Sequence, residues 1–134
     1  MFEPVERQDA RFGQVAQQYL QLRLAELTAN GAGVKFIEKL TSHVALIVEI
    51  VGAQTSVASV DFDLCQTVRG TMAHVPANLS KLYKDKPLEK AIALASEQGK
   101  PALRPVPQGG YLRVLTAILE LAVRKQLIRS NPAA

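Results

Sequence analysis

Apolar residues recur every three or four positions through most of the chain, the spacing that gathers them on one face of an α-helix. The first such segment begins near Arg11 and ends at the Asn-Gly-Ala-Gly sequence of residues 30–33. The second covers residues 34–51 and ends before Gly52, a residue suited to the left-handed conformation that follows many helices. The apolar faces consist of Phe12, Val15, Ala16, Tyr19, Leu20 and Leu27 in the first segment, and of Phe36, Ile37, Leu40, Val44, Ile47, Val48 and Val51 in the second.

The middle of the second segment has a competing interpretation. Residues 44–48 read Val-Ala-Leu-Ile-Val, and such a density of β-branched residues is also typical of a buried strand. The length of the segment and the polar face formed by Lys35, Glu38 and Lys39 favour a helix.

The second half of the chain predicts three more helices. Asp61 is a suitable N-cap for a short helix to about Ala73. Residues 77–86 lack an amphipathic period and are predicted to be a basic loop. Pro87 is expected to be the first residue of a short helix ending at Gly99.

The last helix is predicted over residues 107–126, after a proline-rich loop. The fold class predicted from these segments is all-α. We expect a lead-in over residues 1–10, flexible and loosely held, and one domain over residues 11–134. That domain is expected to be a compact bundle of four main helices with a short extra helix.

Composition places the chain among soluble globular domains. Hydrophobic residues make up 48% of the 134 residues and aromatic residues only 5%, so the core has to be built mainly from Leu, Val, Ile and Ala. Neither a secretory signal nor an apolar run long enough for a membrane span is visible, and a cytoplasmic location is the simplest expectation. Cys65 has no cysteine partner, and His43 and His74 have no suitably spaced ligands, so neither a disulfide framework nor a metal or other cofactor is expected.

Charge is distributed unevenly along the chain. Residues 1–80 contain six Lys/Arg and eight Asp/Glu, a balance of −2, whereas residues 81–134 contain ten and four, a balance of +6. A basic C-terminal half suits a polyanionic partner, nucleic acid first, although a solvated charged surface has the same composition.

Specific sequence motifs in the basic half add to this picture. Residues 76–81 read Pro-Ala-Asn-Leu-Ser-Lys, a Leu-x-Pro loop follows at 103–105, and residues 111–123 read YLRVLTAILELAV. A basic turn and Asn131-Pro132-Ala133 close the segment. These motifs resemble the core-binding domain of phage-type tyrosine recombinases (integrases), closely over residues 76–133 and loosely over residues 12–75.

The resemblance implies a SAM-like helical domain that clamps double-stranded DNA at a recombination site of a phage or mobile element. A downstream catalytic domain of the same parent protein would supply the Arg, Lys and His residues and the Tyr nucleophile. We therefore expect this chain to be a non-catalytic fragment whose partners are DNA, that catalytic domain and other recombinase protomers. Tyr19, Tyr83 and Tyr111 match no nucleophile position of the family.

The chain departs from the family pattern at the start of its last helix. Pro107 stands where the family has a capping Thr, Gly109 and Gly110 replace polar or basic residues of the first turn, and Leu121 replaces a Trp. Two interpretations of the glycines stay open. Their backbone N–H groups could bind a phosphate at an open helix start, or the helix start could simply be frayed.

Candidate DNA contacts lie in the basic half. Arg113 and Arg124 share a helical line with Glu120 and face away from the apolar stripe of the last helix, formed by Leu112, Leu115, Leu119 and Ala122. Loop lysines suit a phosphate backbone, which requires charge more than fixed geometry. For Lys84, Lys86 and Arg124 an ordinary solvated surface is an equal alternative. The full set of candidates is Lys81, Lys84, Lys86, Arg104, Gln108, Gly109, Gly110, Arg113, Arg124 and Lys125.

Two other classes of function compete with DNA binding. A helical module that binds another protein would require an exposed apolar patch. A small helical enzyme or ligand carrier would require a pocket with converging polar groups, and the sequence offers no such group.

Overall fold

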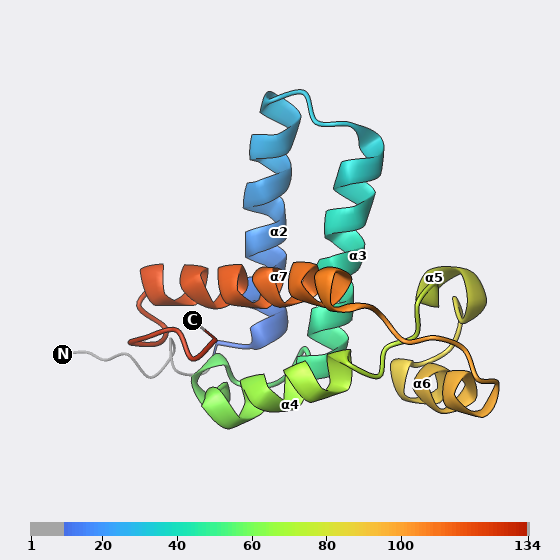
Figure 1. Ribbon diagram of the computed structural model, residues 1–134. Helices are drawn as coiled ribbons and strands as arrows, with labels where there is room; N and C mark the ends of the chain where they lie inside the picture. The colour runs from blue at the N-terminus through green and yellow to red at the C-terminus, as the bar shows by residue number, and fades with distance from the viewer. Residues whose placement is uncertain (1–9, 134) are drawn as a thin grey trace.

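The computed structural model describes residues 10–133, apart from the side chain of Ser80. Within that range the secondary structure is helical, with no strand, and the predicted all-α class is confirmed. Figure 1 shows the helices in chain order: α2 (Phe12–Ala29), α3 (Val34–Val51), the 3₁₀ turn η1 (Val57–Ser59), α4 (Phe62–Met72), α5 (Leu79–Leu82), α6 (Leu88–Glu97) and α7 (Pro105–Arg124).

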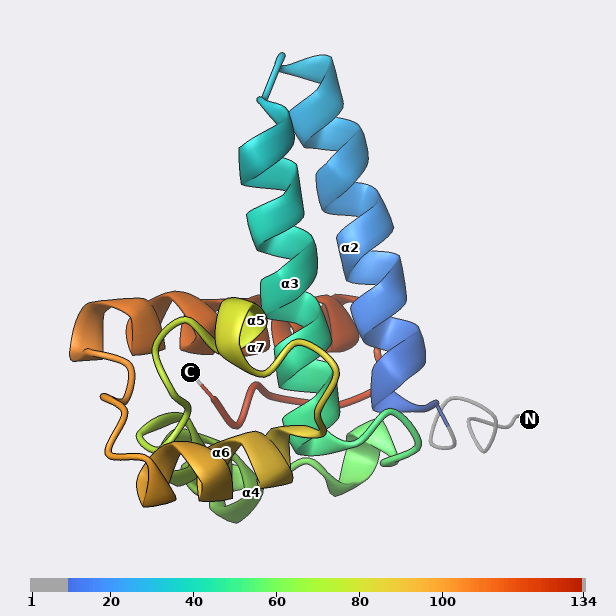
Figure 2. The same ribbon diagram turned by 90° about the vertical axis from the view of Figure 1, so that its right-hand side faces the viewer.

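An antiparallel hairpin of α2 and α3 dominates the shape of the molecule (Figures 1 and 2). Helix α7 crosses the lower half of this hairpin, and α4 lies at the end of the body opposite the hairpin tip. Helices α2, α3 and α7 pack against one another, and α4 packs against α3. The break between α2 and α3 contains Gly31 at a φ of +76°, as the Asn-Gly-Ala-Gly sequence predicts.

The hydrophobic core lies where these four helices meet. The side chains of Phe12, Ile47, Met72 and Leu119 are fully buried there and come from α2, α3, α4 and α7 in turn. Each such side chain contributes about 1.5–3 kcal/mol relative to an exposed position. The core is therefore concentrated at the base of the hairpin.

The distal half of the hairpin has no comparable core. None of the described residues 21–43 is buried, although the helical pattern of apolar residues continues through them. Phe36 lies on the predicted apolar face of its helix but is 54% exposed, so that face is not buried along its whole length. Leu22 is 56% exposed on the facing helix. No third helix covers this part of the hairpin, so its apolar residues remain partly in water (Figure 2).

The beginning of α2 is anchored more firmly than predicted. Residues 1–9 of the predicted lead-in lie outside the described residues, but Ala10 belongs to the fold, because its carbonyl accepts a 2.8 Å hydrogen bond from the N–H of Val57. The N–H of Gly13 donates to the carbonyl of Ala53 at 2.9 Å. A Cβ atom at position 13 would lie 2.9 Å from the Cβ of Ala53, so this close approach requires glycine.

The predicted N-cap of α4 is confirmed. The Asp61 carboxylate accepts a 2.8 Å hydrogen bond from the N–H of Leu64, which makes Asp61 the N-cap. Cys65 is 2% exposed and packs in the core, and this burial raises the pKa of its thiol.

The segment between α4 and α6 differs from its prediction. Residues 79–82 of the predicted basic loop form the one-turn helix α5, which follows Asn78 in the left-handed conformation (φ 61°). Asn tolerates this conformation better than most residues, and the sequence pattern gave no sign of it because one turn is too short to show a period. Pro87 precedes α6 as its N-cap, so the helix begins one residue later than predicted.

Helices α5 and α6 form a side lobe with a small apolar cluster of its own around Tyr83, Ala91 and Ala95. The N–H of Ala77 donates to the carbonyl of Pro101 at 2.9 Å, and the N–H of Leu103 donates to that of Val75 at 2.8 Å. These paired segments connect the lobe to the body and bring the residues before α5 beside those before α7.

Helix α7 begins at Pro105, two residues earlier than predicted, and ends at Arg124. The tail after it returns along the helix. The Asn131 amide donates a 2.9 Å hydrogen bond to the carbonyl of Thr116 in α7. Its side-chain oxygen accepts another, also of 2.9 Å, from the N–H of Ala133. The segment that contains Asn131 and Pro132 is therefore held against α7.

Candidate nucleic-acid interface

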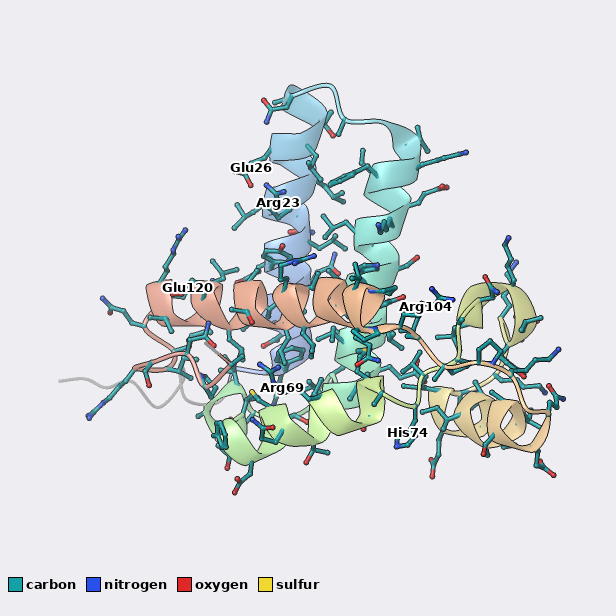
Figure 3. The ribbon with its side chains drawn as sticks, viewed as in Figure 1. Arg23, Glu26, Arg69, His74, Arg104 and Glu120 are labelled. Carbon is teal, nitrogen blue, oxygen red and sulfur yellow. The ribbon has the colours of Figure 1, made fainter. Side chains whose placement is uncertain are left out.

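Four of the predicted contact residues lie around α5 and the start of α7. Lys81 is on α5, Lys84 and Lys86 are in the turn after it, and Arg104 is the N-cap of α7. All four are exposed. The pairing of residues 75–77 with 101–103 places both segments at one end of the body, as the position of Arg104 in Figure 3 shows. We call Lys81, Lys84, Lys86 and Arg104 the basic end.

The charges of the basic end are not neutralised by ion pairs. Among the described residues the salt bridge is that of Arg23 with Glu26, at 3.3 Å, and none of the predicted contact residues forms one. Asp85 lies within the same turn and lowers the local net charge. Exposed, unpaired cations of this kind can neutralise phosphates and release their counterions.

The predicted phosphate site at Gly109 and Gly110 is not formed. These glycines are the fifth and sixth residues of α7, because the helix begins at Pro105. The N–H of Gln108 already donates to the carbonyl of Arg104 at 3.1 Å, so the N–H groups that follow belong to the helix interior. The open N–H interpretation of the glycine pair is therefore wrong, and so is a frayed start at that point.

The true start of α7 is a poor anion site. Its first and third residues are Pro105 and Pro107, which have no N–H to offer. The Gln108 side chain is also engaged, because its amide donates a 2.8 Å hydrogen bond to the carbonyl of Leu103. Affinity for phosphate at the start of α7 therefore has to come from the charged side chains and not from the backbone of the helix.

A second group of predicted residues lines a cleft between α7 and the hairpin. The cleft has a volume of about 660 Å³, and Gly110, Arg113 and Arg124 lie along its α7 side. Glu120, predicted on the same helical line as the two arginines, also lines the cleft, and Figure 3 shows it on α7. The structure thus places four of the candidates at the basic end and three in the cleft.

Lys125 belongs to neither group. Its ammonium group donates a 2.5 Å hydrogen bond to the side-chain oxygen of Gln18 on α2. The 20 residues of α7 separate it from Arg104 by about 30 Å of helix. Arg124 and Lys125 are neighbours in sequence, but Arg124 lines the cleft and Lys125 is turned to Gln18.

The hairpin side of the cleft was not predicted as part of a site. It consists of Tyr19, Leu22, Arg23 and Glu26 from α2 and of Phe36, Lys39, Leu40 and His43 from α3. The periodicity placed Phe36 and Leu40 on one apolar face, but Leu40 packs against the edge of the core whereas Phe36 is exposed. The charges of Arg23 and Lys39 could have indicated a binding surface. Only the crossing of α7 over the hairpin, however, brings these two residues into the same cleft as Arg113 and Arg124.

A ring stack lies beside the cleft, which His43 lines. The centroids of the His43 and Tyr111 rings are 3.9 Å apart, with 22° between their planes. Burial, and secondarily the charge of Lys39, lowers the pKa of His43, and burial raises the pKa of Tyr111. Both rings therefore remain neutral at neutral pH, and the stack joins α3 to α7.

No protein-family model matches the chain, and no curated protein or solved structure matches it either. None of the described helices has both the length and the apolar character needed to cross a bilayer. Within residues 10–133, no three His, Cys, Asp or Glu side chains are grouped as a metal site would require.

Proposed function

We propose that this chain is the DNA-binding, SAM-like core-binding domain of a tyrosine recombinase of the phage-integrase type. It would grip one side of a duplex at a recombination site while a downstream catalytic domain acts on the other. The chain itself would carry no catalysis, and it would act in the bacterial cytoplasm, where its DNA target is found.

The observation that carries this proposal is the basic end, where Lys81, Lys84, Lys86 and Arg104 are exposed and unpaired beside α7. Two of the sequence motifs behind the resemblance flank this cluster. The Pro-Ala-Asn motif leads into α5, and the Leu-x-Pro motif leads into α7. Flexible cations beside a rigid helix suit the backbone contacts that position a protein on DNA.

Arg113 extends the proposed contact surface along α7 into the cleft. Arg124 lies further along the same side, and Lys125 is turned to Gln18. We therefore assign the strongest phosphate contacts to the basic end and to Arg113, and the weakest to Lys125. The domain alone should bind duplex DNA weakly, with Kd on the order of 10⁻⁴–10⁻⁶ M at physiological salt.

The test is a fluorescence-anisotropy titration of duplex DNA at several salt concentrations. Replacing the four residues of the basic end with alanine should weaken binding and lower the slope of log affinity against log salt by about 0.9 for each phosphate that the variant no longer neutralises. The matched control removes the same amount of charge at four exposed positions elsewhere: Lys35→Ala, Arg69→Ala, Lys90→Ala and Arg129→Ala.

The control variant should keep most of the salt slope. Equal reductions in both variants would mean that only net charge matters and would contradict a specific DNA surface. Unchanged binding by the variant of the basic end would place the contacts elsewhere. In the full parent protein, the basic-end variant should also recombine more slowly, because the clamp would hold its site less firmly.

A further inference from the structure

Two groups of exposed apolar side chains lie beside charged residues and are not among the proposed DNA contacts. One is the hairpin side of the cleft, where Leu22 and Phe36 lie. The other is the start of α4, where Phe62 is 62% exposed. Large exposed apolar side chains beside charged groups are a feature of binding surfaces. The charged residues beside the cleft are mainly basic, whereas those beside Phe62 are acidic.

The cleft is apolar within and basic around it. Leu22, Phe36 and Leu40 supply apolar surface, while Lys39 and Arg124 lie beside them without a salt-bridge partner among the described residues. Glu26 is already paired with Arg23, which leaves Glu120 as the unpaired carboxylate of the lining. The cleft therefore favours an apolar side chain that has negative charges next to it.

The start of α4 has the complementary character. Phe62 stands between Asp61 and Asp63, and all three residues are exposed. The Asp61 carboxylate is held in place by its 2.8 Å bond to the N–H of Leu64. We call these three residues the acidic knob.

We infer that the acidic knob of one copy of this chain docks into the cleft of a second copy. The Phe62 ring would pack on Leu22 and Phe36, and the two aspartates would lie against Lys39 and Arg124. A volume of about 660 Å³ has room for an aromatic side chain, since pockets of roughly 300–1,000 Å³ enclose whole small molecules.

The positions of the two surfaces determine the kind of assembly. Helix α4 lies at the end of the body opposite the hairpin tip (Figures 1 and 2). None of its residues lines the cleft, so the knob does not reach the cleft of its own molecule. The contact is head-to-tail, and each copy can bind one neighbour through its knob and another through its cleft. One aromatic side chain with two charges forms a small interface, so the association is weak and transient.

The test is sedimentation equilibrium of the chain without DNA, at rising protein concentration and low salt. The average mass of the wild-type chain should rise above the 14.6 kDa of one copy.

Two variants each remove one side of the contact. Phe62→Ser removes the aromatic ring of the knob, Phe36→Ser removes its contact in the cleft, and each variant alone should remain monomeric. Both residues are exposed, so the folds should survive, and thermal unfolding followed by circular dichroism verifies this. Val106→Ser, at an apolar residue 82% exposed and outside the cleft lining, is the matched control and should associate like the wild type.

Mixing the two variants gives the sharper result. A molecule lacking the knob still has a cleft, and a molecule lacking the cleft contact still has a knob, so the mixture should form a complex that stops at two copies. Charge reversal should behave in the same way. Asp63→Lys and Lys39→Glu should each abolish association, and their mixture should restore it.

Several results would overturn the inference. A wild-type chain that stays monomeric at every concentration would do so, and so would association that persists in Phe62→Ser. A third is that Phe36→Ser weakens duplex DNA binding but leaves self-association unchanged, which would assign the cleft to DNA. Because Phe36, Lys39 and Phe62 are not among the proposed DNA contacts, these results are independent of the test of the basic end.

Discussion

The imidazole of His43 lies against the phenol ring of Tyr111, with 3.9 Å between the ring centroids. The two residues come from α3 and α7, and their stack joins the hairpin to the last helix beside Gly110. A Cβ atom at position 110 would lie 3.5 Å from the His43 ring, an ordinary contact distance. The stack therefore does not require glycine at position 110.

The first prediction concerns the pH dependence of stability. Burial lowers the pKa of His43 below its ordinary value of 6.5. The unfolded chain therefore takes up a proton at a higher pH than the folded chain does. The contribution of neutral His43 to stability is complete above pH 6.5 and decreases as the pH falls through the folded-state pKa.

This dependence can be measured with His43→Phe, which keeps an aromatic ring but cannot titrate. Between about pH 8 and pH 5 the wild-type chain should lose free energy of unfolding relative to that variant. The NMR titration midpoint of the His43 ring should lie below 6.5. A midpoint above that value, or parallel pH profiles of the two proteins, would contradict the prediction.

The second prediction concerns the link between α3 and α6. The Glu49 carboxylate accepts a 2.7 Å hydrogen bond from the N–H of Leu88, the first residue of α6. The N-cap Pro87 has no side-chain oxygen, so a residue from another helix performs the capping. Glu49→Ala should lower the free energy of unfolding by about 1 kcal/mol. Urea unfolding measures this, with Glu38→Ala on the same helix as control, and equal losses in both would show that the bond contributes nothing specific.

The third prediction compares the same substitution at two glycines. Gly13→Ala should destabilise the fold by about 1–3 kcal/mol, because the new methyl group would press on Ala53 at 2.9 Å. Gly109→Ala should stabilise it by about 0.5–1 kcal/mol, because position 109 is in the interior of α7 with nothing within 4 Å of the new atom. Thermal unfolding of both variants should therefore shift in opposite directions. A stabilising Gly13→Ala would show that the close contact with Ala53 is not maintained in solution.

The sequence predicted the helices well but predicted the surfaces only in part. Periodicity identified the segments around Phe12, Ile47 and Leu119 because their apolar faces meet a common core. The same periodicity failed at Phe36, because it shows which residues share a face but not whether anything covers that face. The second wall of the cleft, with Lys39, depends on a tertiary crossing that no local pattern encodes.

Helix ends that depend on local interactions could be predicted from the sequence, whereas those that depend on distant residues could not. Asp61 was identified as an N-cap because its side chain caps its own helix, a local interaction that sequence reveals. Glu49 caps α6 from 39 residues away, and in the sequence it only interrupts an apolar run. The start of α7 was placed two residues late because the prolines of residues 100–107 indicated a loop, whereas Pro105 has the fixed φ that suits a first helical residue.

The last prediction concerns Asn131, whose amide donates to the carbonyl of Thr116 while its side-chain oxygen accepts from the N–H of Ala133. Asn131→Ala removes both bonds and should cost about 1–3 kcal/mol, with faster hydrogen exchange over residues 127–133. Asn131→Asp keeps the acceptor but sets a carboxylate against the Thr116 carbonyl, so it should be at least as destabilising at neutral pH. Protonation at low pH would turn that carboxylate into a donor, and the Asp variant should then recover part of its loss relative to the wild type at the same pH. The Ala variant has no group that could recover. If both variants show the same deficit at neutral pH and at about pH 4, near the ordinary pKa of an Asp carboxyl, the tail is held by the packing of Leu127 and Ile128 on the core, and the amide bond to α7 contributes little.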